Sequence, residues 1–181
     1  SAVDGTWLNP RKGAAPVTAV CTDSRKIAPG CLFLPWVGER FDGHDFAAKA
    51  LELGAAAVVV DRDLGLPRQI RVEDTHAAYP LLCANFFGRP ADSMKMIGVT
   101  GTNGKTTSVF LIKHLLTAAG HRTGLIGTVQ NEIGDLVLPA KFTTPDPYQL
   151  QSMLAKMRAA GCEYVAMEVS SHALDQERVA G

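Results

Sequence analysis

Residues 96–107 read Met-Ile-Gly-Val-Thr-Gly-Thr-Asn-Gly-Lys-Thr-Thr, and this stretch decides how the chain around it folds. An apolar run leads into a glycine-rich turn and then into a helical pattern, so we predict a strand, a phosphate-binding loop and a helix. Glycines let backbone N–H groups surround a phosphate, and the helix presents its positive end to the same anion. In such a loop Lys105 reaches the β- and γ-phosphates of a nucleotide, and the Thr106 hydroxyl holds a magnesium ion.

One position departs from the general pattern of such loops, G-x-x-x-x-G-K-[ST]. The pattern requires glycine at position 99, whereas this chain has Val99, with glycines at 98 and 101. The loop is therefore a variant, and its specificity rests on the whole string. The alternative is a glycine-rich turn that binds no ligand, and the lysine and two threonines directly after Gly104 disfavour it.

The composition sets bounds on the class of protein. The chain has 181 residues, 46% of them hydrophobic, which suits one medium domain or two small ones. The formal net charge is zero, which argues against nucleic acid or an anionic membrane as a partner. The four cysteines have no metal or redox spacing, as expected for core thiols in a reducing cytosol. With no signal peptide pattern and no stretch long enough to cross a bilayer, we expect a cytoplasmic protein; the sequence indicates no oligomeric state.

Strands alternating with helices before residue 88 predict a small α/β domain. After a loose lead-in, strands are expected at 17–21, 31–34, 55–60 and 69–72, and helices at 46–53 and 75–87. Asp45 and Asp74 are the expected N-caps of these helices. Pro35 predicts that the second strand lies at a sheet edge or carries a bulge. Residues 88–94 are the expected linker, with the first domain at 1–92.

The second domain, 93–181, is expected to be an incomplete P-loop domain with a mostly parallel sheet. The strand into the loop is followed by a helix at 105–119, a strand at 123–128, an extended piece at 137–142, a helix at 147–160 and a strand at 164–169. Asp146 and Pro147 make a good start for the second helix. The pattern places three parallel strands, which leaves one edge of the sheet open.

The string at 100–107 resembles the Mur ligase family, the ATP-dependent enzymes that build the peptide stem of bacterial peptidoglycan. Glu-Val-Ser-Ser-His at 168–172 and Thr-Thr-Pro-Asp at 143–146 extend the resemblance. Together they narrow it to the members that add a diamino acid to UDP-N-acetylmuramoyl-L-alanyl-D-glutamate. The resemblance covers roughly residues 17–181 and implies a UDP-sugar-peptide-binding domain followed by an ATP-binding domain.

The resemblance implies ATP and Mg²⁺ as cofactors. Lys105 and Glu168 would be catalytic, and Thr106 and Glu168 would bind the metal. An acid at the carboxyl end of an apolar strand suits this role, although such an acid alone equally often begins a loop. The implied ATP-binding residues are Gly101, Thr102, Asn103, Gly104, Lys105, Thr106 and Thr107.

The resemblance also implies substrate-binding residues in both domains: Ser24, Glu39, Arg40, Phe41, Thr143, Thr144, Ser170, Gln176 and Arg178. An arginine such as Arg178 is suited to clamp the D-glutamyl carboxylate, and a solvated helix charge is the plain alternative. The threonine pair has an alternative as part of a helix cap, and Asp-Ser-Arg at 23–25 is a common turn. Phe142 replaces the asparagine that some members carry, and His44 is expected to be structural.

The resemblance implies that ATP phosphorylates the D-glutamate carboxylate and that an amine of the diamino acid then displaces phosphate. We expect meso-diaminopimelate rather than L-lysine, because it is the more widespread diamino acid. The family's enzymes are much longer, with a third domain and a carbamylated lysine beyond residue 181. We therefore expect this chain to be a fragment or one part of a split system, and not to complete the ligation alone.

Three alternatives stay open. One is a non-catalytic module that binds a sugar nucleotide and ATP, which intact Ser24, Lys105 and Glu168 disfavour. Another is a different Mur-type ligase. The third is an unrelated P-loop NTPase, which explains residues 98–107 and Glu168 but not the strings at 143–146 and 170–172.

Overall fold

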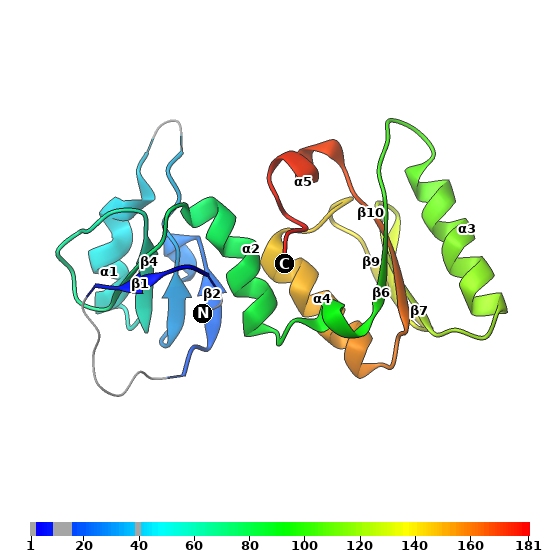
Figure 1. The fold of residues 1–181 in the computed structure, drawn as a ribbon, viewed down its shortest axis with the longest axis horizontal. Coiled ribbons are helices and arrows are strands. Elements are labelled where there is room, and N and C mark those ends of the chain that lie inside the picture. The colour runs from blue at the N-terminus through cyan, green and yellow to red at the C-terminus, as the bar shows by residue number, and fades with distance from the viewer. Residues whose placement is uncertain (1–2, 9–15, 39–40) are drawn as a thin grey trace. The chain divides into compact units, whose positions relative to one another are not determined.

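The computed structural model describes residues 3–8, 16–38 and 41–181 (Figure 1). The chain divides into two compact units, Ser1–Phe86 and Phe87–Gly181. The division thus falls after Phe86, whereas the sequence suggested residue 92. The reason is that the expected linker forms a short 3₁₀ helix, η3 (Pro90–Ser93), that packs within the second unit, where Ala91 and Met94 join the core. Each helix in the described part of the chain is too short or too polar to cross a membrane.

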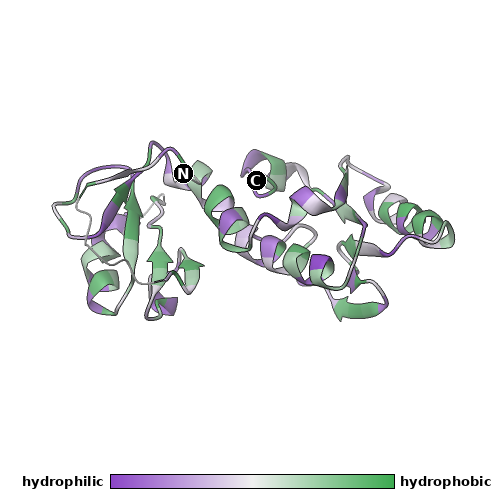
Figure 2. Ribbon diagram, turned by 60° about the horizontal axis from the view of Figure 1, so that its bottom comes forward, coloured by the Kyte–Doolittle hydropathy of each residue, from purple (hydrophilic) through white to green (hydrophobic). Residues whose placement is uncertain are grey.

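The first unit is built on a five-stranded sheet in the order β1-β5-β4-β3-β2. Strands β2 to β5 run parallel, and β1 pairs antiparallel with β5. The strands are β1 (Thr6–Trp7), β2 (Ala19–Cys21), β3 (Cys31–Phe33), β4 (Ala57–Val60) and β5 (Gln69–Arg71). Every residue of β3 and β4 is buried, as expected for parallel strands covered on both faces, and Figure 2 shows strands of this sheet in the green of hydrophobic residues.

Short helical segments lie between these strands, namely η1 (Ser24–Lys26), η2 (Gly43–Phe46) and α1 (Ala47–Glu52), and a longer helix, α2 (Thr75–Phe86), follows β5. Asp74 caps α2 as expected, since its carboxylate accepts the backbone N–H of His76 at 2.7 Å. The expected cap at Asp45 was wrong. The chain enters α1 through η2, and Asp42 caps η2 by accepting the N–H of His44 at 2.9 Å, whereas no side chain caps α1 itself.

Two further expectations for the first unit were wrong. Strand β3 lies between β2 and β4, so it is neither an edge strand nor bulged at Pro35. The proline is tolerated because β3 ends at Phe33, two residues earlier, and no ladder bond is lost. The lead-in, in turn, contains β1, which is too short for a periodic pattern to reveal.

The second unit is built on a sheet in the order β6-β10-β7-β8-β9. The strands are β6 (Lys95–Val99), β7 (Thr123–Ile126), β8 (Gln130–Ile133), β9 (Leu136–Pro139) and β10 (Tyr164–Glu168). Strands β6, β10 and β7 are parallel, whereas β7, β8 and β9 pair antiparallel. The prediction of three parallel strands therefore missed part of the sheet. The β8–β9 hairpin extends the sheet beyond β7, and only part of the sheet is parallel.

Helices cover both faces of this sheet (Figure 1). Helix α3 (Lys105–Ala118) lies on one face, where Val109 packs with Leu125 and Ala166. Helix α4 (Pro147–Ala159) lies on the other face, where Leu154 and Met157 join the main core. Strand β10 serves both cores because successive side chains point to opposite faces. A short helix, α5 (Ser171–Asp175), follows β10.

Candidate functional site

The loop between β6 and α3 has the backbone that the sequence predicts. Strand β6 ends at Val99, and α3 begins at Lys105. Gly101 has φ +133° and Gly104 has φ +81°, a region that side-chain-bearing residues rarely adopt. Gly104 is the N-cap of α3, and no side chain caps the helix there. The first N–H groups of α3 therefore remain available to an anion at the loop.

Lys105 turns back over the loop. Its ammonium Nζ donates a hydrogen bond to the Gly101 carbonyl oxygen at 2.6 Å, although the side chain remains solvent-accessible. The positive charge thus lies at the turn that the two glycines shape. A phosphate bound there would compete with a neutral carbonyl for the ammonium group, and the charged acceptor makes the stronger bond.

Glu168 is the buried acid of the site, with 1% of its surface exposed. Its Oε2 accepts the hydroxyl of Thr106 at 3.0 Å, so the first turn of α3 and the end of β10 meet through these two side chains. The approach depends on a glycine, because a Cβ on Gly127 would lie 2.6 Å from Glu168 Oε1. The structure therefore brings together the hydroxyl and the carboxylate that the sequence assigned to Mg²⁺.

These donors fit a magnesium ion. Hydroxyl and carboxylate oxygens are ligands that Mg²⁺ prefers, and the ion usually completes its coordination with water and substrate phosphates. The described residues contain no cluster of three His, Cys, Asp or Glu side chains, which is the pattern of an all-protein metal cage. Thr106 and Glu168 would hold the ion, which would supply neutralisation of phosphate charge.

A residue that the sequence analysis missed completes the contacts of the acid. Thr128 follows β7, and its backbone N–H donates to Glu168 Oε1 at 2.8 Å. Its hydroxyl lies 3.1 Å from Glu168 Oε2 and 3.0 Å from the hydroxyl of Thr143. The available signal was its place after a buried strand beside β10, since side chains following parallel strands gather at one sheet edge.

The predicted substrate residues of the second unit form one neighbourhood. The Thr144 hydroxyl is buried, donates to the Glu168 carbonyl at 3.0 Å and accepts the Ser170 N–H at 3.1 Å. The Ser170 hydroxyl caps α5 by accepting the N–H of Ala173 at 3.1 Å. Thr144 therefore fixes the backbone around Glu168, while Thr143 remains the more accessible threonine of the pair. Phe142 is exposed beside them.

Arg178 folds back onto this neighbourhood. Its guanidinium donates to the Thr144 carbonyl at 3.2 Å and to Gln176 Oε1 at 2.6 and 2.8 Å. The guanidinium therefore makes bonds to neutral acceptors and has no carboxylate partner among the contacts described for it. Neutral acceptors leave its charge uncompensated, as a residue that clamps a substrate carboxylate requires.

In the first unit the predicted residues lie after β2 and β3. Ser24 begins η1, which Asp23 caps by accepting the N–H of Arg25 at 3.0 Å. The Arg25 guanidinium also binds Asp23 and holds the pKa of that carboxyl at about 2. Phe41 is 64% exposed, and Glu39 and Arg40 lie outside the described residues.

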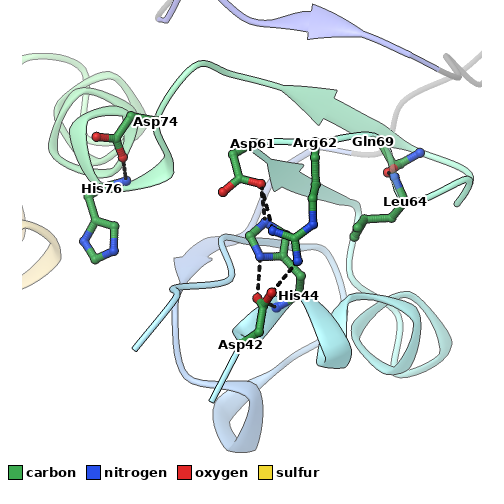
Figure 3. A network of polar contacts seen from close by, with 8 residues as sticks. All are labelled: Asp42, His44, Asp61, Arg62, Leu64, Gln69, Asp74 and His76. Carbon is green, nitrogen blue, oxygen red and sulfur yellow. Dashed lines mark hydrogen bonds and ion pairs between the residues drawn. The ribbon is translucent and has the colours of Figure 1, made fainter. Parts of the chain in front are cut away.

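A polar network follows in the same unit, around the buried ring of His44 (Figure 3). His44 Nδ1 lies 2.7 Å from Asp42 Oδ1, and its Nε2 lies 3.2 Å from Asp61 Oδ1 but out of line for a hydrogen bond. Arg62 pairs with both carboxylates. These bonds from His44 and Arg62 lower the pKa of Asp42 well below its usual range. The network ties Asp42 and His44 to the two residues that follow β4, and the sequence analysis had found only its histidine.

The second unit also contains an apolar cavity of about 340 Å³ between β6, α4 and the last residues. Its lining includes Met96, Leu150, Leu154, Leu174 and Val179. Thr100 and Gln151 are the polar side chains of this lining, which contains no charged residue, so the cavity is more apolar than the site around Lys105 and Glu168.

The fold and the site together define a P-loop protein: a glycine-rich turn between a strand and a helix, with Lys105 and Thr106 at the turn and an acid on the neighbouring strand. Two family models match the chain, "Mur ligase family, catalytic domain" at residues 16–85 and "Mur ligase middle domain" at residues 99–181. The chain therefore belongs to the Mur ligase family, as the sequence strings indicated.

Relatives with the name "UDP-N-acetylmuramoyl-L-alanyl-D-glutamate--2,6-diaminopimelate ligase" match most or all of the chain. The Clostridium perfringens protein is 46% identical over 88% of this chain and 34% of its own length. The Geobacillus kaustophilus protein is 44% identical over 100% of this chain and 37% of its own. A solved structure of a ligase with the same name aligns with a TM-score of 0.79 and 30% identity, covering 96% of this chain and 36% of the other. The chain thus spans about a third of the length of the relatives it matches.

Proposed function

We propose that this chain forms the UDP-substrate and nucleotide-binding part of an ATP-dependent ligase that adds meso-diaminopimelate to UDP-N-acetylmuramoyl-L-alanyl-D-glutamate. The observation that carries the proposal is the contact of Thr106 with the buried Glu168 at the phosphate loop. The neighbouring threonine pair and Arg178 support a carboxylate-bearing substrate beside that loop. The names of the relatives supply the particular substrates. We place the activity in the cytoplasm, where ATP is available.

The chemistry joins a carboxylate to an amine. An oxygen of the D-glutamyl carboxylate bonds to the γ-phosphorus of ATP while the bond to ADP breaks, giving an acyl phosphate. An amine of the diamino acid then attacks the acyl carbon, loses a proton and expels phosphate. Lys105 and the N–H groups at the start of α3 would neutralise the transferring phosphate. Arg178, Thr143 and Ser170 would orient the substrate carboxylate.

The amide-forming step needs a bound diamino acid, and the family places that site in the third domain. Since the chain spans about a third of its relatives, we propose that it binds UDP-dipeptide and Mg-ATP without completing the ligation. Turnover distinguishes a ligase from a non-catalytic module, because in a ligase adding the remaining domains restores turnover.

Calorimetric titration of the chain with UDP-N-acetylmuramoyl-L-alanyl-D-glutamate, and separately with Mg-ATP, tests the proposal. We expect saturable binding of both, loss of the UDP-dipeptide signal in Ser24→Ala and Arg178→Ala, and loss of the Mg-ATP signal in Lys105→Ala. Lys156→Ala, an exposed lysine on α4, is the matched control for charge removal. Binding of Mg-ATP by a folded chain that ignores the UDP-dipeptide would sink the substrate assignment and leave an NTPase-like loop.

A further inference from the structure

Thr128 occupies a position between the substrate side and the metal side of the proposed site. It contacts Thr143, which follows β9, and Glu168, which ends β10. Glu168 in turn contacts Thr106 at the start of α3. Four segments of the second unit therefore meet in one chain of side chains: Thr143, Thr128, Glu168 and Thr106.

The direction of these hydrogen bonds follows from proton counting. The ionised Glu168 carboxylate can only accept, so the hydroxyls of Thr106 and Thr128 must both donate to Oε2. Each hydroxyl has one proton, which leaves Thr128 only its lone pairs for the contact with Thr143. The Thr143 hydroxyl therefore donates to Thr128, and the chain runs from Thr143 through Thr128 to Glu168.

A substrate that bears a carboxylate would interrupt this chain at its first member. The carboxylate is an acceptor and takes the Thr143 proton, because a bond to a charged acceptor is stronger than one to a hydroxyl. Thr128 then loses the donor that polarises it, and its own bond to Glu168 weakens because neighbouring hydrogen bonds strengthen one another. The charge on Glu168 is then less compensated, which favours a cation beside it.

We propose that Thr128 is a positioning residue that couples the two ligands, so that binding of the UDP-dipeptide at Thr143 tightens binding of Mg-ATP at Thr106 and Glu168. The inference rests on the proposed function, since it takes its two ligands from there. A second feature supports a positional role. The Thr128 N–H holds Glu168 Oε1 at 2.8 Å, so that both carboxylate oxygens are fixed by this one residue.

The coupling has a measurable size. The effect of the UDP-dipeptide passes to Glu168 through one neutral hydrogen bond. We therefore expect saturating UDP-dipeptide to lower the dissociation constant of Mg-ATP by a factor on the order of three to ten. By linkage, Mg-ATP must tighten UDP-dipeptide binding by the same factor. This reciprocity gives two independent measurements of one quantity in the same chain.

The test measures that factor by calorimetry in the 181-residue chain and three variants. Thr128→Val keeps the shape and the backbone N–H but removes the hydroxyl, so each ligand should still bind alone while the factor falls to about one. Thr128→Ser restores the hydroxyl and should restore the factor. Thr117→Val, an exposed threonine of α3, is the matched control and should behave as wild type.

Each result decides something. Three results would overturn the coupling and leave the proposed function intact. The first is a coupling factor that Thr128→Val retains, and the second is a factor of one in wild type that binds both ligands. The third is weaker Mg-ATP binding in the presence of UDP-dipeptide. Failure of wild type to bind one ligand alone contradicts the proposed function and the coupling together. If Thr128→Val does not fold, Thr128→Ser and Thr143→Ser, which keep both hydroxyls, must retain the factor for the proposal to stand.

Discussion

Gly127 shows how much of the site depends on a single missing atom. A Cβ at this position would lie 2.6 Å from Glu168 Oε1, so Gly127→Ala should push the carboxylate away from Thr106. We expect Mg-ATP affinity to fall by about tenfold or more, which corresponds to about 1.4 kcal/mol. Calorimetric titration with Mg-ATP measures this directly.

Gly124→Ala is the matched control for that prediction. Its Cβ would lie 2.6 Å from Met157 Sδ in the core rather than from an oxygen of the site. Overpacking should lower the free energy of unfolding by about 1–3 kcal/mol while the Mg-ATP affinity stays at the wild-type value. Equal affinity losses in both variants would mean that Gly127 acts through stability alone.

Asp42 gives the first unit a defined response to acid. Its pKa is depressed in the folded chain by the N–H of His44 and by Arg62, so its contribution to stability is present above the unfolded pKa of about 3.9. That contribution is lost as the pH falls toward the depressed folded value. We expect the stability of the first unit to decline below about pH 4, and Asp42→Asn to flatten the decline.

Fluorescence from Trp7 and Trp36, the two tryptophans of the chain, monitors the first unit. Asp23, whose pKa is also lowered, should account for part of the decline that remains in Asp42→Asn. Asp135→Asn, in the turn of the second unit's hairpin, is the control. An acid profile that is the same in Asp42→Asn and in wild type would contradict the role of the network.

The residues that sequence reasoning identified share a property. A charged residue such as Lys105 or Glu168 has few structural roles directly after a glycine-rich turn or at the end of a buried strand. The sequence pattern around these two residues therefore indicates a function. Thr128 is a common residue after a strand, and its role depends on β7 lying next to β10, which is a pairing between segments far apart in sequence. The roles of Asp61 and Arg62 depend in the same way on contacts with His44 and Asp42, which lie far from them in sequence.

At the scale of elements, the β8–β9 hairpin is held to α3 by an ion pair between a half-buried lysine and a buried glutamate. Lys113 binds Glu132, which also accepts Gln130 Nε2 at 2.8 Å. Lys113→Met leaves Glu132 buried with one donor fewer and should cost about 2–4 kcal/mol of unfolding free energy in chemical denaturation. Lys141→Met, at an exposed loop position, should cost far less.

The double variant Lys113→Met with Glu132→Leu separates charge from packing. Removing both charges replaces the pair by apolar contacts, so the double variant should recover part of the stability that the single variant loses. A double variant that is no more stable than Lys113→Met would show that the lysine stem, not the ion pair, holds the hairpin.

Most helices and buried strands could be predicted because each carries a cap, a period or a continuous apolar run, as Asp74 and Asp146 illustrate. The hairpin was missed although Gly134 and Asp135 form a two-residue turn signal between its strands, with Gly134 at φ +60°. The hairpin strands have only four residues each, so periodicity alone could not separate them from a loop. Strand order could not be predicted at all, because it is set by packing between distant segments.

At the scale of the whole chain, the two compact units should respond differently to ligands. The phosphate loop lies wholly in the second unit, whereas both tryptophans lie in the first. Mg-ATP at 100 times its dissociation constant should stabilise the second unit by about 2.7 kcal/mol, because a ligand stabilises only the folded region that binds it. Tryptophan fluorescence should therefore show little shift in the first unit.

Cys162, the cysteine of the second unit, provides the complementary probe, because its thiol is buried and becomes reactive only on opening. We expect Mg-ATP to move the denaturant midpoint of Cys162 labelling, read by peptide mass mapping, and Lys105→Ala to abolish that shift. UDP-dipeptide should also move the labelling midpoint, because its proposed contacts in the second unit include Thr143 and Arg178. If Mg-ATP moved both midpoints equally, the two units would unfold as one, and the phosphate loop would stabilise the chain as a whole.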